Sequence, residues 1–138
     1  MTTMTDRNKA IIDEFRANQG RVGGYFEGHP LLLLHHRGAR SHKIRVNPLA
    51  YQALEGGSWA VFGSKGGSPD NPDWFHNLKA NPDAEIEVGT ERFKVRARVA
   101  GGGERERIWE RQKELMPGFA DYERKTSRAI PVVVLEPR

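Results

Sequence analysis

The stretch of sequence that decides the fold is residues 30–63, PLLLLHHRGARSHKIRVNPLAYQALEGGSWAVFG. Turn signals interrupt it twice, at Gly38 and at Gly56-Gly57, and the segments between the turns are rich in leucine, β-branched and aromatic residues. Strands joined by such short turns pair antiparallel, because parallel neighbours need a long crossover connection. The stretch therefore predicts three strands of an antiparallel sheet: Pro30–His36, His42–Leu54 and Ser58–Gly63.

The rest of the chain extends this sheet. A Gly89-Thr90 turn separates two further strand-like segments, and in the second of them apolar residues alternate with Arg and Lys, which predicts one dry and one wet face. Six or seven strands are expected in all. The additional segments are Val22–Glu27, Glu85–Val88, Glu91–Ala100 (with Phe93, Val95, Ala97 and Val99 on the dry face) and Ile130–Leu135.

Helices are expected between and beside the strands. Asp6 is expected to cap an N-terminal helix, residues 6–18, whose apolar stripe consists of Ile11, Ile12 and Phe15. Asn71 and Pro72 have the residue types of an N-cap and a first helical position. The other expected helices are Pro72–Ala80, Glu104–Met116 and Pro117–Lys125. The predicted fold class is mostly β with peripheral helices, a small antiparallel barrel forming a single domain over residues 1–138.

Composition excludes several classes of protein. The chain has no Cys, which rules out disulfides, thiolate metal sites and Cys nucleophiles and fits a cytoplasmic protein. Its longest aliphatic runs, Leu31–Leu34 and Val132–Leu135, are far shorter than the roughly 20 residues that span a bilayer. The N-terminus lacks the apolar core of a signal peptide. Peripheral membrane contact through the N-terminal helix is left open, as is a homodimer.

The net charge of +4 is concentrated in one place. The stretch from Gly28 to Leu54 contains no acid, and its four Arg and Lys residues equal the whole net charge: Arg37, Arg40, Lys43 and Arg45. Nucleic acid is disfavoured as the partner, because no Phe, Trp or Tyr lies within Leu31–Ala50 to stack on bases. Such a cluster suits the phosphate or carboxylate groups of a smaller ligand, which Arg binds bidentately.

A second loop carries the same chemistry. Gly63-Ser64-Lys65-Gly66-Gly67 also follows a predicted strand, and its glycines allow backbone N–H groups to approach an anion closely. The two loops together predict one elongated anionic ligand. The His35-His36 pair is not expected to bind metal, because adjacent strand residues point to opposite faces and no Cys or nearby acid accompanies them. We expect one of these histidines in the core and the other facing solvent.

The motifs of the chain resemble those of the deazaflavin-dependent nitroreductase family, whose members use coenzyme F420. The resemblance covers nearly the whole chain. It is carried by Leu31–Leu34, the turn Gly38–His42, Arg45-Val46-Asn47-Pro48-Leu49, Ser64–Gly67, the helix motif Pro72–Pro82, and Thr126–Val132. The chain departs from the family pattern at Ala39, where a basic residue is usual, and at His42, where Gly is usual.

The resemblance implies a split β-barrel that takes a hydride from the reduced deazaflavin. It places Arg40, Ser41, Lys43, Arg45 and Lys65 around the coenzyme's phosphate and glutamate tail. Val46, Asn47, Pro48, Ser64 and Gly66 would meet the remainder of the coenzyme, with Trp74 and Asn77 on the helix beside it. Met116, Phe119 and Tyr122 occupy positions where nitroreducing members carry tyrosines, and only Tyr122 keeps a hydroxyl.

The expected reaction is hydride transfer to a small electron-poor acceptor: a quinone, an activated enone or lactone, or a nitro compound. Tyr122 or water would protonate the product, and Ser64 would stabilise developing charge. Two alternatives remain open from the residues. One is a split-barrel oxidoreductase that binds FMN instead. The other is a non-enzymatic module that binds an anionic cofactor.

Overall fold

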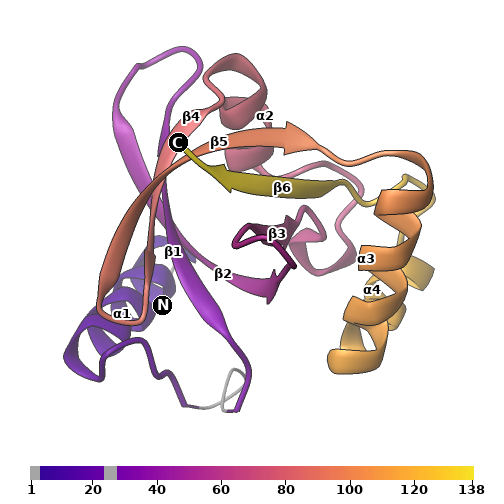
Figure 1. Cartoon of the computed structure of the whole chain (residues 1–138), viewed down its shortest axis with the longest axis horizontal. Helices are drawn as coiled ribbons and strands as arrows, with labels where there is room; N and C mark the ends of the chain where they lie inside the picture. The colour runs from indigo at the N-terminus through magenta and orange to yellow at the C-terminus, as the bar shows by residue number, and fades with distance from the viewer. Residues whose placement is uncertain (1–3, 24–27) are drawn as a thin grey trace.

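The computed structural model describes residues 4–23 and 28–138, which form an antiparallel barrel of six strands in the order β1-β2-β3-β6-β5-β4 (Figure 1). The expected fold class is confirmed. No strand covers residues 21–23, and the rest of the expected strand Val22–Glu27 lies outside the described residues. The strands are β1 Leu31–Arg37, β2 Ile44–Ala53, β3 Trp59–Phe62, β4 Asp83–Val88, β5 Glu91–Val99 and β6 Val132–Pro137.

Four α-helices and one 3-10 turn surround the barrel: α1 Met4–Ala17, η2 Lys65–Gly67, α2 Asp73–Ala80, α3 Gly102–Leu115 and α4 Gly118–Lys125. All four expected helix starts were one or two residues off; α3 begins at Gly102 instead of Glu104, and α4 begins at Gly118 instead of Pro117. α1 begins before Asp6, which therefore lies inside the helix. The N-cap of α2 is Pro72 in an extended conformation, one residue later than expected, because the Asn71 side chain accepts a hydrogen bond from Arg128 instead.

The core occupies the barrel interior and continues beneath α1. Leu32 and Leu34 point inward, where Trp74 of α2 packs with them. Leu31 and Leu33 point outward and are covered by the apolar stripe of α1, whose Phe15 is only 1 % exposed. The stripe therefore docks on the barrel. Among the described residues, no helix is long and apolar enough to cross a membrane.

A second core cluster lies at the opposite side of the barrel, where α3 and α4 pack against the outer face of β3 (Figure 1). Phe62 meets Trp109 and Phe119 there, with ring centroids 5.9 and 5.6 Å apart. The expected dry face of β5 holds for Val95, which is fully buried, but was wrong for Val99, which is 52 % exposed. Val99 is the last residue of β5 and lies outside the interior cluster.

The ring of strands is split between β2 and β3. Only residues 51–53 of β2 pair with β3, whereas residues 44–50 pair with β1 alone. The N–H of Tyr51 donates to the carbonyl of Pro30. Backbone polar groups alternate in direction along a strand, so those of Val46 and Pro48 face away from β1, toward the open edge. Pro48 is tolerated here because its missing N–H would have faced that unpaired edge.

Candidate functional site

The turn between β1 and β2 forms one end of the split. The N–H of Gly38 donates to the carbonyl of Lys43 (2.9 Å), and the N–H of His42 donates to the carbonyl of Gly38 (3.0 Å). His42 adopts a φ of 61°, a left-handed conformation that favours glycine. The turn thus keeps a glycine-like shape despite the departure at this position. Arg40, Ser41 and Lys43 are exposed on it, and the Ser41 hydroxyl oxygen accepts from the N–H of Lys43.

A buried hydrogen-bond network supports this turn from within. The Asn77 side-chain oxygen accepts from the N–H of Ala39 (3.0 Å), so its amide nitrogen donates to Nδ1 of His36 (3.0 Å). His36 then carries its proton on Nε2 and donates it to the side-chain oxygen of Asn47 (2.7 Å). Asn77 is fully engaged within the protein, and it links α2 to the turn and to β2.

Burial lowers the pKa of His36 below its usual value, and the nearby positive charge of Arg45 lowers the pKa further, against the opposing hydrogen bond to Asn47. His36 is therefore neutral near pH 7, in agreement with the tautomer that the network requires. The amide nitrogen of Asn47 has no hydrogen-bond partner among the described residues, and the residue is partly exposed. One donor of the network therefore stays available to a ligand at the split.

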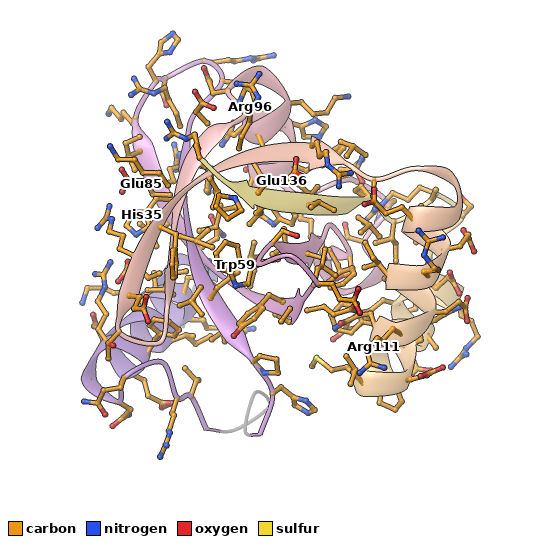
Figure 2. All side chains as sticks on the ribbon, viewed as in Figure 1. His35, Trp59, Glu85, Arg96, Arg111 and Glu136 are labelled. Carbon is orange, nitrogen blue, oxygen red and sulfur yellow. The ribbon has the colours of Figure 1, made fainter. Side chains whose placement is uncertain are left out.

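The expectation of one buried and one solvent-facing histidine was half wrong. His36 is buried, but His35 is also largely covered and contacts Glu87 on the outer wall of the barrel. Figure 2 shows His35 there beside Glu85, its partner in the β1–β4 register. The two imidazole rings lie on opposite sides of β1, because side chains of adjacent strand residues point to opposite faces. Among the described residues, no three His, Asp or Glu side chains come together as metal ligands.

The loop after β3 borders the other side of the split. Its 3-10 turn contains Lys65, which is exposed and has a φ of 46°. The N–H of Gly67 donates a hydrogen bond to the carbonyl of Ser64 (2.9 Å) and closes the turn. A Cβ on Gly67 would lie 2.8 Å from Cβ of Lys125 and 3.0 Å from the carbonyl of Tyr122, so only glycine lets α4 approach this closely. The fold therefore brings Tyr122 beside the Ser64–Gly67 turn.

The side chain of Arg128 holds this loop together. Its guanidinium donates to the carbonyls of Gly63, Ser64 and Ser68 at 2.9–3.0 Å and to the side-chain oxygen of Asn71 at 2.7 Å. In the sequence, Arg128 stands out only as part of the motif Thr126–Val132. Ser68, one of its hydrogen-bond partners, lies 60 residues away in the sequence. Such a separation leaves no periodic or compositional signal, so only the structure shows what Arg128 contacts.

The expected site residues divide into two groups. Those at the turn, along the open edge of β2 and on the loop after β3 border the split: Arg40, Ser41, Lys43, Arg45, Val46, Asn47, Pro48, Ser64, Lys65 and Gly66. Trp74 and Asn77 lie deeper. Trp74 packs in the barrel core, and the amide of Asn77 is engaged with His36 and Ala39. These two support the wall of the split from behind.

The residues at the split suit a planar ligand with an anionic tail. In the part of the chain that the structure describes, Arg40, Lys43, Arg45 and Lys65 are exposed or at the mouth of the barrel and form no ion pair with a carboxylate. The open edge of β2 offers the backbone groups of Val46 and the amide of Asn47. Such a donor set fits the phosphate, carboxylates and hydrogen-bonding ring of a deazaflavin coenzyme.

Comparison with known proteins identifies relatives with this architecture. A curated F420H(2)-dependent quinone reductase of Mycobacterium tuberculosis strain H37Rv is 42% identical over 128 residues, covering 90% of this chain and 85% of the relative. The solved structure of an F420-H2 dependent reductase superposes with a TM-score of 0.70 at 40% identity, covering 78% of this chain and 94% of that one.

A third relative, whose structure is described as a domain-swapped dimer, has a TM-score of 0.72 at 35% identity and covers 97% of this chain and 100% of its own. The family model described as F420H(2)-dependent quinone reductase matches residues 7–137, almost the whole chain. Together with the identity to the mycobacterial relative, this match shows that the chain belongs to the F420H(2)-dependent quinone reductase family.

Proposed function

We propose that this protein transfers a hydride from the reduced deazaflavin coenzyme F420H2 to a quinone. The observation that carries the proposal is the group of four exposed cations without carboxylate partners in the described residues, near the unpaired edge of β2, in a chain that belongs to this family. These cations are Arg40, Lys43, Arg45 and Lys65. Bound F420H2 supplies the hydride, and the protein contributes binding, orientation and control of the proton. Activated enones, lactones and nitro compounds are further candidate acceptors, because they accept a hydride for the same electronic reason.

The cations would hold the anionic end of the coenzyme. Arg40 and Lys43 on the turn, Arg45 at the start of β2 and Lys65 on the opposite loop surround the mouth of the split, and each is free of carboxylates in the described residues. The deazaflavin ring of the coenzyme would lie along Val46, Asn47 and Pro48. The His36–Asn47 hydrogen bond fixes the orientation of the Asn47 amide, so that its nitrogen is presented to an acceptor without rearrangement.

Proton delivery is assigned to the α4 side of the split. Tyr122 is partly exposed, and its ring packs edge-on against Phe119 with centroids 5.3 Å apart. The close approach of α4 to Gly67, where the backbone carbonyl of Tyr122 meets the turn that follows Ser64, supports this assignment. We assign the Tyr122 hydroxyl, or water, as the donor that protonates the reduced quinone oxygen, and the Ser64 hydroxyl as a donor to charge that develops there.

The test is to mix the purified protein with F420H2 and a water-soluble quinone under anaerobic conditions. We expect the absorbance of the oxidised deazaflavin to rise with one equivalent of quinone consumed. Reactions with an enone, a lactone and a nitroarene measure acceptor preference, and reduced FMN replaces F420H2 as the control. No oxidation of F420H2 by any acceptor would contradict the proposal, and a protein that purifies with bound FMN would favour the flavin alternative.

A homodimer is a second, separate proposal. It is supported by the relative whose structure is described as a domain-swapped dimer and whose whole chain this one matches. Light scattering on the size-separated protein measures the mass directly. A dimer mass at micromolar concentration supports the proposal, and a monomer mass throughout the dilution series contradicts it.

A further inference from the structure

The C-terminal segment between α4 and β6 forms the back of the loop that follows β3. The N–H of Gly63 donates to the carbonyl of Pro131 (2.9 Å), and a Cβ on Gly63 would lie 2.7 Å from the Pro131 ring. Gly67 lies against α4 in the same way. The loop of residues 63–71 is thus held at its start and in its middle, and Arg128 reaches into it from this segment.

Arg128 uses four of the five N–H donors of a guanidinium on this loop. Nε donates to the carbonyl of Ser68 (3.0 Å), and Nη2 donates to the carbonyl of Ser64 (2.9 Å). Nη1 donates twice, to the carbonyl of Gly63 (3.0 Å) and to Oδ1 of Asn71 (2.7 Å). All four acceptors are neutral oxygens. Arg128 forms no ion pair with a carboxylate in the part of the chain that the structure describes, so its positive charge is not neutralised.

This arrangement has a consequence for the direction of the loop's dipoles. The carbonyls of Gly63, Ser64 and Ser68 turn toward one guanidinium, so the negative ends of these three dipoles face Arg128. The Lys65 side chain of the same loop is exposed. A lysine ammonium could not replace the fork, because it is a compact charge without the planar donor geometry. The Arg128 charge lies behind the loop and adds to the attraction for an anion in front of it.

We propose that Arg128 is a positioning residue of the coenzyme site. It holds the loop of residues 63–71 in the shape that presents Lys65 to the anionic tail of the coenzyme, and its unneutralised charge strengthens that attraction. The inference rests on the proposed function, since it assumes that an anionic coenzyme binds at the split. It requires no contact between Arg128 and the coenzyme.

The test compares Arg128→Gln, Arg128→Lys and a matched control, Arg105→Gln. Arg105 donates from Nη2 to the carbonyl of Ile130 (2.7 Å) and therefore ties down the same C-terminal segment without touching the loop. Dissociation constants for oxidised F420 are measured by fluorescence, and thermal midpoints are measured without coenzyme. We expect Arg128→Gln to weaken binding at least 10-fold and Arg128→Lys at least 3-fold, whereas Arg105→Gln weakens it less than 2-fold.

Rescue separates positioning from a general loss of structure. Guanidinium ion at millimolar concentration should restore part of the affinity of Arg128→Ala and leave that of Lys65→Ala unchanged. Wild-type affinity in Arg128→Gln, or equal losses in Arg128→Gln and Arg105→Gln, would overturn the inference. If Arg128→Gln does not fold, Arg128→Lys is compared with Arg105→Gln instead: wild-type affinity in Arg128→Lys, or a loss equal to that of Arg105→Gln, would overturn the inference. Wild-type protein that fails to bind F420 would instead overturn the proposed function.

Discussion

Two populations of cations lie on two sides of the barrel. On the outer wall built by β4, β5 and β6, the strand register sets acids opposite bases, as at Asp83–Arg96, and the side chains form ion pairs. Arg98 binds both oxygens of Glu104 (2.6 and 2.8 Å) and one oxygen of Glu136 (3.0 Å). Figure 2 shows Glu136 and Arg96 on this wall. At the split, by contrast, the cations lack such partners in the described residues.

Under the proposed function, the cations of the split serve a ligand, whereas the paired cations serve the fold. Exposed ion pairs contribute little stability, but they neutralise one another and attract no anion. Cations without acids keep their full field at the place where an anionic coenzyme would bind. The two populations contain the same residue types, so residue type alone does not distinguish them.

The largest effect is expected from removing the cations of the split. Arg45→Ala and Lys65→Ala should each weaken F420 binding by at least about 1 kcal/mol, and the double variant by about 2 kcal/mol, because each loses a charge-assisted hydrogen bond. Fluorescence titration gives the dissociation constants. Arg96→Ala, which removes a paired cation from the outer wall, is the matched control and should bind the coenzyme with wild-type affinity. If both single variants bound as tightly as the wild type, the two populations would not differ in function.

A smaller effect is expected from the buried histidine beneath the split. The pKa of His36 is lowered in the folded protein, so the unfolded chain binds more protons below its usual pKa of about 6.5. The stability that His36 contributes is therefore complete above about pH 6.5 and is lost as the pH falls below it toward the lowered pKa. His36→Gln should flatten the decline in the free energy of unfolding between pH 7 and pH 5.

Urea denaturation at each pH measures this slope. His76→Gln, on the exposed side of α2, is the control and should leave the slope unchanged. Arg45→Ala should make the decline shallower as well, because the Arg45 charge helps to lower the pKa of His36. An identical slope in wild type and His36→Gln would mean that protonation of His36 does not contribute to the pH dependence of stability, and that His36 is not coupled to the charges at the split.

The smallest effect is expected on the outer wall. Arg98→Ala breaks the contacts with Glu104 and Glu136, and the free energy of unfolding should fall by about 0.5 kcal/mol because exposed ion pairs contribute little. Coenzyme affinity should not change. Chemical denaturation and coenzyme titration of the same sample test both statements. A clear loss of affinity in Arg98→Ala would mean that the paired cations also act on the ligand.

Local patterns in the sequence determined most of the barrel. Alternation in residues 91–97 and the short glycine turns specify strands and antiparallel neighbours, because both depend only on residues close together in the chain. The concentration of bases without acids in Gly28–Leu54 likewise pointed to the region proposed to bind the coenzyme. Two of the errors involve partners distant in the sequence: the Asn71 side chain accepts a hydrogen bond from Arg128 instead of capping α2, and His35 contacts Glu87 instead of solvent.

Only the tertiary structure decided how the site is held together. The sequence pointed to Arg45, Lys65 and the two loops, because charge and glycine content are visible residue by residue. It could not show that β3 stops pairing with β2 after three residues, that His36 and Asn77 brace the turn, or that Arg128 gathers the loop carbonyls. These contacts join residues 11 to 65 positions apart, and their geometry exists only once the barrel has closed.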